Sequence, residues 1–328
     1  MNKCKKIITF ERKGERVMSK GKVRTVLGDI NPKEMGYTLS HEHILTNPQG
    51  MGSKVEDDHK LNSLEKAIEM CKIFKATGGG TLIEATPKTW GRNTPGMVIA
   101  SQESGVHVVA CTGYICEEHG TMKQDVAGKS IDEVAEGFIH DVTVGMDGTS
   151  VKAGWIKAGT AYNYISEAEE KVIRAGARAA EETGACLHFH TGIGTMGLEI
   201  IEILEDEKFD LSRVIIAHVD RFPDYWYHKK MLQKGVSLIY DGPGKAKYYP
   251  DSMRVELIKN IIRDGFADQL MLSNDMGRRS HHTVYGYGPG FNFIKEKFIP
   301  RLLEEGVAQS DIDKFMIYNP ARMYAMVK

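Results

Sequence analysis

The sequence predicts an α/β protein with a single (β/α)8 barrel, the TIM-barrel architecture, and a binuclear metal site at the C-terminal ends of its strands. Three observations predict this fold. Eight short apolar runs alternate with segments of helical periodicity along the 328 residues. Eight such units fit a closed barrel better than an open doubly wound sheet. No G-x-G-x-x-G pattern follows the first run, which disfavours an open dinucleotide-binding sheet.

The apolar runs are expected to form the parallel strands, and helices are expected between most of them. Residues 61–77 place apolar side chains at helical spacing until Gly78. Ser166 and Glu169 have the spacing of a capping box that opens a helix. Residues 252–264 show a third helical pattern. The eight expected strands span residues 37–45, 81–85, 106–112, 153–158, 186–190, 214–218, 236–240 and 269–273.

The composition indicates one globular domain. Apolar residues make up 41% and charged residues 27%, which suffices for a full core and a polar surface. No linker or composition break divides the chain, so we expect the barrel over residues 22–328 and an N-terminal extension over residues 1–21. The formal net charge of −1 disfavours nucleic acid or an anionic membrane as a partner.

The cysteines and the hydropathy predict a cytoplasmic protein. Five cysteines without a C-x-x-C pair, and no signal-peptide pattern, indicate reduced thiols. No segment approaches the roughly 20 consecutive apolar residues of a membrane span.

Several of the expected strands end in side chains that can bind a metal. In a (β/α)8 barrel these strand ends meet on one face. Alternation along the first strand points His41 and His43 to one side and Glu42 to the other. The candidate ligands are His41 and His43 from the first strand, Lys157 from the fourth, His190 from the fifth, His218 from the sixth and Asp275 after the eighth.

Each candidate also has a structural interpretation. A single histidine at a strand end is more often a hydrogen-bonded structural residue than a ligand. Lys157 could extend to solvent or pair with a carboxylate, and Asp275 could cap the next helix. Their joint occurrence, all at strand ends of the same polarity, favours a metal site.

The remaining histidines are weaker candidates. His107 opens the third strand, at the wrong end of the barrel for this site. His119 follows that strand, so a role at the mouth stays open, and His188 shares a face with His190 and could support it. The others are expected to be solvated, namely His59, His140 and His228.

At these residues the chain resembles the phosphotriesterase-like branch of the amidohydrolase superfamily. The resemblance runs from about residue 22 to the C-terminus and keeps the order and spacing of the motifs. The matching segments are Ser40-His41-Glu42-His43, Gly154-Trp155-Ile156-Lys157, His188-Phe189-His190-Thr191, Ile216-Ala217-His218-Val219-Asp220, Ser273-Asn274-Asp275 and Asn319-Pro320-Ala321-Arg322.

The resemblance implies two divalent metal ions. His41, His43 and Asp275 would hold one ion, and His190 and His218 the other. Lys157, carbamylated by CO2, would bridge them; some relatives have Glu at this position. A hydroxide between the ions would be the nucleophile, and Asp275 would take its proton. Zinc suits this histidine-rich set best, and manganese or cobalt would also fit.

Two loops after the seventh and eighth strands suggest the substrate. They carry four cations, which are Lys245, Lys247, Arg278 and Arg279. A solvated rim is the better interpretation of any one of them, but the clustering favours a phosphate pocket. The neighbouring His281-His282 could reshape this pocket.

The loops resemble those of the family's phosphorylated sugar lactonases, so the preferred function is hydrolysis of a phosphorylated sugar lactone. The alternatives within the class are an unphosphorylated lactonase, a carboxylesterase and a phosphotriesterase. From another class, a non-catalytic sugar-phosphate binding barrel would keep the cations but would not need six metal ligands. A dehydrogenase is disfavoured by the missing glycine pattern. The expected partner is a small-molecule substrate, and a homodimer stays an open alternative.

Overall fold

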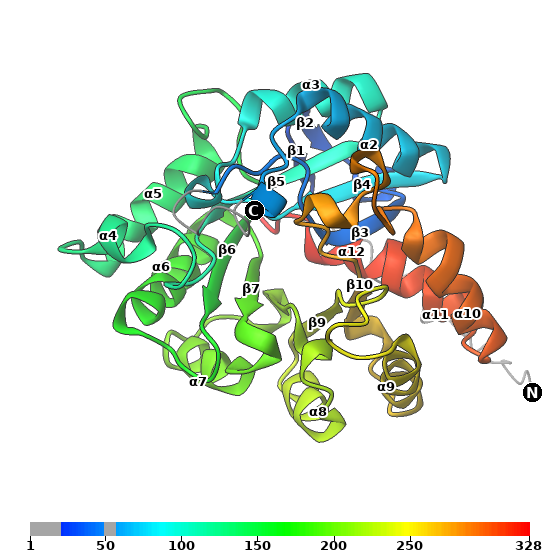
Figure 1. The fold of residues 1–328 in the computed structure, drawn as a ribbon. Helices are drawn as coiled ribbons and strands as arrows, with labels where there is room; N and C mark the ends of the chain where they lie inside the picture. Colours follow the sequence, from blue (N-terminus) through cyan, green and yellow to red (C-terminus); the bar gives the residue numbers. More distant parts are fainter. Residues whose placement is uncertain (1–20, 49–56) are drawn as a thin grey trace, which may run out of the picture.

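The computed structural model describes residues 21–48 and 57–328, so the predicted extension lies outside the described residues except for Gly21. Eight parallel strands form a nearly closed barrel and confirm the predicted fold (Figure 1). Each predicted run coincides with one strand of the sheet. The strands are β3 (Tyr37–Glu42), β4 (Gly79–Glu84), β5 (His107–Gly113), β6 (Trp155–Thr160), β7 (Leu187–Thr191), β8 (Val214–Ile216), β9 (Ser237–Tyr240) and β10 (Leu270–Leu272).

Helices surround the barrel, and the three predicted helical segments are confirmed as α2, α6 and α9. The capping box forms at the start of α6, where Ser166 Oγ accepts from Glu169 N at 3.2 Å and Glu169 Oε2 accepts from Ser166 N at 2.9 Å. Two π-helical segments, Ile294–Phe298 and Lys314–Tyr318, lead into α10 and α12. None of the helices in the described ranges is long and apolar enough to cross a membrane. The α-helices are α2 (Leu64–Ala76), α3 (Thr94–Ser104), α4 (Met122–Val126), α5 (Ile131–Thr143), α6 (Glu167–Thr183), α7 (Gly197–Asp206), α8 (Tyr225–Gln233), α9 (Asp251–Arg263), α10 (Ile299–Glu304), α11 (Gln309–Asp313) and α12 (Asn319–Met323).

A small hairpin that the sequence did not predict precedes the barrel. Its strands β1 (Val23–Thr25) and β2 (Gly28–Ile30) have three residues each, too few for a period-2 pattern to be recognised. Val26 N donates to Val108 O at 2.9 Å, which ties the hairpin to β5 near the N-terminal end of that strand. Val23 also pairs with Ala325, so the hairpin meets the end of the chain there.

The core has two layers, as the alternation of strand side chains requires. One layer fills the barrel and the other lies between the strands and the helices. Inside the barrel, the Trp155 ring stacks on the His188 ring with centroids 4.6 Å apart, and Tyr324 Oη lies 3.0 Å from His188 Nδ1. These three buried rings form a floor beneath the C-terminal mouth.

Hydrogen bonds from side chains and from the main chain join β3, at one end of the ladder, to the residues that follow β10 at the other end. The backbone ladder runs in the open order from β10 to β3. Across the remaining seam, Ser273 Oγ accepts from His41 N at 2.9 Å and Asp275 N donates to His41 O at 3.1 Å. The buried Glu42 carboxylate accepts from Asn274 N at 2.8 Å and from Met276 N at 2.9 Å. The seam therefore lies directly beside the predicted ligands His41 and Asp275.

Candidate metal centre

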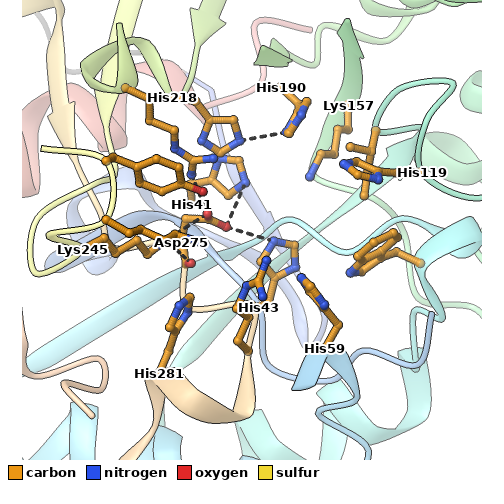
Figure 2. Close-up of a pocket in the computed structure, with 17 residues that line it drawn as sticks. His41, His43, His59, His119, Lys157, His190, His218, Lys245, Asp275 and His281 are labelled. Atoms are coloured by element: carbon orange, nitrogen blue, oxygen red, sulfur yellow. Dashed lines mark hydrogen bonds and ion pairs between the residues drawn. The ribbon is translucent and has the colours of Figure 1, made fainter. Parts of the chain in front are cut away.

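A pocket of about 330 Å³ opens at the C-terminal ends of the strands. Figure 2 shows the side chains that line it, and they come from segments far apart in the sequence. All six predicted ligand residues lie on its wall: His41, His43, Lys157, His190, His218 and Asp275. The barrel thus brings the whole predicted set together.

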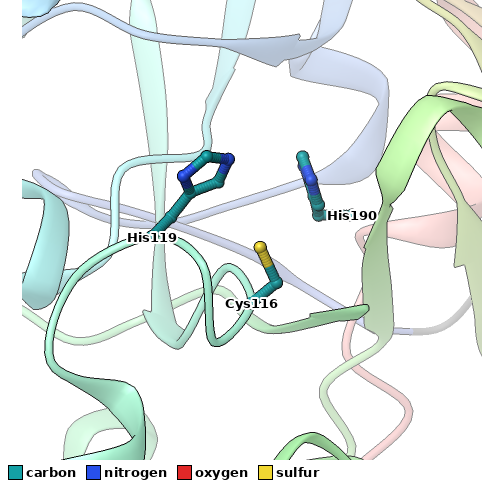
Figure 3. A group of neighbouring side chains, drawn as sticks. All are labelled: Cys116, His119 and His190. Carbon is teal, nitrogen blue, oxygen red and sulfur yellow. The ribbon is translucent and has the colours of Figure 1, made fainter. Parts of the chain in front are cut away.

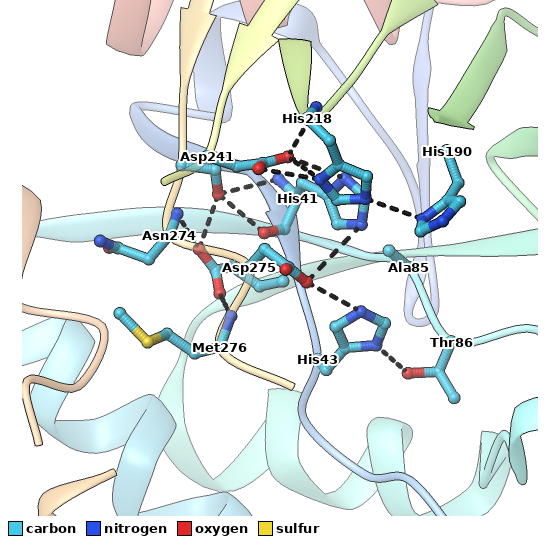
Figure 4. Close-up of polar contacts among 12 residues, drawn as sticks. His41, His43, Ala85, Thr86, His190, His218, Asp241, Asn274, Asp275 and Met276 are labelled. Atoms are coloured by element: carbon cyan, nitrogen blue, oxygen red, sulfur yellow. Dashed lines mark hydrogen bonds and ion pairs between the residues drawn. The ribbon is translucent and has the colours of Figure 1, made fainter. Parts of the chain in front are cut away.

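His41, His43 and Asp275 form the first group of candidate ligands (Figure 4). Asp275 Oδ1 lies 3.4 Å from His43 Nε2 and 4.0 Å from His41 Nε2. The backbone of Asp275 is left-handed with φ 49°, a strained conformation for a residue with a side chain and one that is common at functional sites.

A chain of hydrogen bonds on the side of the ring remote from Asp275 fixes the orientation of His43. Its Nδ1 donates to Thr86 Oγ1 at 2.8 Å, and Thr86 Oγ1 donates to Glu84 Oε1 at 2.6 Å. This chain places the His43 proton on Nδ1 and leaves the lone pair of Nε2 facing Asp275. Such a partner on the remote nitrogen is typical of metal-binding histidines.

His190 and His218 form the second group. His190 Nδ1 lies 2.8 Å from His218 Nε2. The other nitrogen of His218, Nδ1, donates to the buried Asp241 carboxylate at 2.7–2.8 Å. His218 Nε2 therefore faces His190 with its lone pair, and Asp241 takes the orienting role that the sequence did not assign to any residue.

Burial keeps the imidazoles of the site neutral. It lowers the pKa of His41, His190 and His218 well below the usual histidine value and lowers the pKa of His43 as well. Burial alone would raise the pKa of Asp275, but Lys245, His43 and Arg221 outweigh it, and this pKa lies well below its usual range. Neutral imidazoles beside an ionised carboxylate are a suitable donor set for a divalent cation.

Lys157 points into the same space from β6. Its side chain is buried, and Nζ donates to Ala85 O at 2.6 Å. Burial lowers the pKa of this amine, which favours its neutral form. No ion pair joins Lys157 to a carboxylate of the described residues within 4.0 Å. The structural alternative of a lysine–carboxylate pair is therefore not observed.

The four predicted cations separate into three environments. Lys247 and Arg278 line the pocket. Lys245 also lines it, but its Nζ donates to Asp275 Oδ2 at 2.9 Å, so it acts on a candidate ligand. Arg279 lies outside the pocket wall, where Nε donates to Lys60 O at 2.7 Å and Nη2 to Asn62 Oδ1 at 3.1 Å.

Two adjacent histidines also differ in position. His281 lines the pocket, whereas His282 is buried behind it and Nε2 donates to Met276 O at 2.7 Å. Only His281 can therefore shape the pocket surface directly.

Sequence reasoning missed several residues of the pocket. Arg221 is buried and donates from Nη2 to Asp275 Oδ2 at 2.6 Å and to Asp241 Oδ1 at 3.1 Å. Its only sequence signal is its place three residues after a strand-end histidine. Trp90 and Tyr248 add aromatic surface to the wall, and they lie in a short 3-10 helix and a loop, respectively, where the sequence shows no periodic pattern.

Of the three histidines expected to be solvated, one lines the pocket and is partly exposed, and one is buried. His59 lies on the pocket wall, with its ring 5.7 Å from the Trp90 ring. His228 is fully buried, and protein groups satisfy both of its ring nitrogens. Its Nε2 donates to Val219 O at 2.8 Å, and its Nδ1 accepts from Tyr240 Oη at 2.7 Å. The sequence places both histidines in polar or helical segments, and this placement did not predict their contacts. His140 is exposed as predicted.

A buried ion pair supports the loop that carries Asp241. Asp220 Oδ2 accepts from Arg254 Nε at 2.6 Å and from Gly242 N at 2.9 Å, and Oδ1 accepts from Asp241 N at 3.2 Å. A Cβ at Gly242 would lie 2.3 Å from Asp220 Oδ2, so only glycine allows this close approach. The pair therefore fixes the residue that orients His218.

Replacing Asp220 by asparagine should lower the free energy of unfolding by about 1.5–3 kcal/mol, because it removes the buried charge-assisted hydrogen bond to Arg254 Nε and leaves Asp251, 3.0 Å from Arg254 Nη1, as the remaining carboxylate partner. Urea denaturation followed by circular dichroism measures this loss. The control is Glu256→Gln at the exposed pair of Glu256 and Lys259, where a change of at most about 0.5 kcal/mol is expected. An unchanged urea midpoint for Asp220→Asn would show that the buried pair does not stabilise this loop.

The chain is similar to known hydrolases over nearly its whole length. A crystal structure of a lactonase from Listeria monocytogenes has a TM-score of 0.89 and 35% identity, covering 94% of this chain and 100% of that one. A phospho-furanose lactonase from Mycoplasmopsis synoviae is 31% identical, covering 92% of this chain and 91% of the relative. An N-acetyltaurine hydrolase from Danio rerio is 30% identical, covering 92% and 97%. The model of the phosphotriesterase family matches residues 21–324. The chain therefore belongs to the phosphotriesterase family, a family of metal-dependent hydrolases.

Proposed function

We propose that this protein hydrolyses the lactone of a phosphorylated sugar and uses two divalent ions. The observation that carries the proposal is that two cations not engaged by Asp275, Lys247 and Arg278, line the same pocket as the candidate metal ligands. The similar lactonase and phospho-furanose lactonase support the same reaction and an anionic sugar substrate. The pocket volume of about 330 Å³ suits a small molecule.

The donor atoms of the pocket fit two ions. His41, His43 and Asp275 would hold one, and His190 and His218 the other, with zinc the preferred metal because the set is rich in imidazole. Lys157 would hold both through a carbamate formed with CO2. The low pKa of this buried amine supports carbamylation, since a neutral amine is the form that reacts. Bound ions would lower the pKa of water and polarise the substrate carbonyl.

Asp275 is placed to handle the proton of the reaction. Its Oδ1 faces His41 and His43, whereas its Oδ2 is held by Arg221 and Lys245. We propose that Asp275 accepts the proton of the attacking water and passes it to the oxygen that leaves the carbonyl. Lys245, His43 and Arg221 hold the pKa of Asp275 below its usual range, so its carboxylate is ionised and free of the proton that it would accept.

Lys247 and Arg278 would bind the phosphate. Burial lowers the pKa of Lys247, and electrostatic repulsion from Arg278 and Arg221 lowers it further. A bound phosphate would relieve this repulsion and accept charge-assisted hydrogen bonds from both. Trp90, Tyr248 and His281 would enclose the sugar part of the substrate.

A second candidate is an amide with an anionic tail. N-Acetyltaurine, the substrate named for the Danio rerio relative, is an amide that ends in a sulfonate. The same cations would suit a sulfonate, and metal-assisted hydrolysis opens esters and amides alike. The two candidates therefore differ in the bond that is cleaved, not in the charge that is recognised.

One substrate panel separates these functions. It contains a phosphorylated sugar lactone, the same lactone without phosphate, an N-acyltaurine and a paraoxon-type triester, each assayed with enzyme loaded with zinc or manganese. We expect the phosphorylated lactone to have the highest kcat/KM, with a large margin over the triester. Higher kcat/KM for the triester or the acyltaurine would overturn the assignment. Binding of the lactone without turnover by any loaded enzyme would favour the non-catalytic alternative.

A further inference from the structure

Cys116, His119 and His190 form another group of potential ligands at the pocket, where the two histidines line the wall and Cys116 is buried beside them (Figure 3). One ligand atom from each lies within 4.8 Å of the others. Cys116 and His119 follow β5 in a tight turn in which His119 N donates to Cys116 O at 3.2 Å. Figure 3 shows both side chains directed toward His190, which comes from β7. The proposed reaction uses neither Cys116 nor His119.

This group has a different chemical character from the proposed catalytic ligands. A thiolate with two imidazoles suits soft and borderline ions such as Cd²⁺ and Zn²⁺. Tetrahedral zinc, with Zn–S of about 2.3 Å and Zn–N of about 2.0 Å, would draw these atoms together by at most about 1 Å. Cys116 is buried, but His119 and His190 line the pocket, so an ion and a fourth ligand can enter from the mouth.

His190 connects this group to the proposed catalytic centre. Its Nδ1 lies 2.8 Å from His218 Nε2, on the side of the proposed catalytic ions. The His119 ring lies 6.0 Å from the His190 ring, nearly perpendicular to it. One imidazole therefore stands between two sets of ligands.

We infer that Cys116, His119 and His190 form an auxiliary site for a soft divalent cation. An ion at this site competes with the catalytic centre for the His190 imidazole. Excess Cd²⁺ or Zn²⁺ therefore inhibits the enzyme at this position, whichever substrate the catalytic centre takes. The shared histidine is the only part of the inference that rests on the proposed function.

Cadmium titration tests the site without a turnover assay. The parent is the metal-loaded enzyme with Cys4→Ser, because Cys4 lies outside the described residues and would add a thiol. Cd²⁺ is added, and the near-ultraviolet absorption of cadmium-bound thiolate is recorded. We expect the band to saturate at about one thiolate-bound ion per chain. Burial raises the pKa of the Cys116 thiol to about 12, so thiolate contributes little absorption before the ion binds.

Matched variants assign the band to a residue. Cys116→Ser should abolish it, whereas Cys186→Ser should leave it unchanged, because Cys186 is also buried but precedes the other end of β7. His119→Asn should keep the band but weaken cadmium binding roughly tenfold or more. This variant also serves if Cys116→Ser fails to fold.

The inhibition assay is read separately on whichever substrate the enzyme turns over. Loss of activity should follow the rise of the band and move to higher Cd²⁺ concentration in His119→Asn. No band in the parent, or a band that His119→Asn leaves at the same affinity, would overturn the inference. A band without lactone hydrolysis would instead count against the proposed function alone.

Discussion

Lys157→Ala should lose most of its bound metal and roughly a thousandfold in kcat/KM, since metal assistance contributes several kcal/mol to catalysis and each 1.36 kcal/mol is tenfold in rate. Lys157 is buried on β6 with the other candidate ligands around the same pocket. A carbamate at this position would be the only proposed protein ligand shared by both ions. Elemental analysis should give close to two equivalents of metal for the wild type and far fewer for the variant.

A second lysine provides the control for this experiment. Lys171 Nζ donates to Lys129 O at 2.8 Å, just as Lys157 Nζ donates to a main-chain oxygen, but Lys171 belongs to helix α6 outside the barrel. Lys171→Ala should keep both metal and activity. Addition of a short carboxylic acid should partly restore Lys157→Ala, because it can take the place of the bridge. A Lys157→Ala protein with two ions and normal turnover would show that Lys157 is structural.

The double variant Lys247→Ala/Arg278→Ala should lose about 10²–10⁴-fold in kcat/KM on a phosphorylated lactone. Each charge-assisted contact contributes about 1.5–3 kcal/mol, which is roughly tenfold to a hundredfold per residue. The same lactone without phosphate has no partner for these cations and should be nearly unaffected. Steady-state kinetics on the matched pair of substrates measures the difference.

Arg279 is the matched control for the phosphate pocket. It follows Arg278 directly, but its guanidinium hydrogen-bonds Lys60 O and Asn62 Oδ1 instead of lining the pocket. Arg279→Ala should therefore change both substrates to the same small extent. If Lys247→Ala and Arg278→Ala also affect both substrates equally, these side chains support the loops and do not bind phosphate.

The sequence predicted the barrel and the grouping of the six candidate ligands well because both follow from strand position. Apolar runs such as residues 186–190 identified β7, and barrel geometry then required its C-terminal end to meet those of its neighbours. The proximity of His190 and His218 could therefore be predicted from the strand positions alone, without knowledge of any loop. Their roles as metal ligands stay predictions.

What the sequence could not predict depends on loops and on buried hydrogen bonds. Arg278 and Arg279 are adjacent in sequence, and no periodic rule says that only the first faces the pocket. His228 appeared solvated because its partners come from a 3-10 turn and from β9. Asp241 was missed as the partner of His218 because a carboxylate one residue after a strand has no distinctive pattern.

The seam between β3 and β10 gives the candidate metal centre a mechanical consequence. His41 belongs to the first strand of the barrel and His43 follows directly after it, whereas Asp275 follows the last strand. An ion held by these three side chains would cross-link the two ends of the barrel where the backbone ladder is open. Such a cross-link closes a very long loop, and its effect on the chain entropy grows with the logarithm of that length. Binding of such an ion would be linked to closure of the barrel, so the free energy of unfolding would rise with the concentration of free metal.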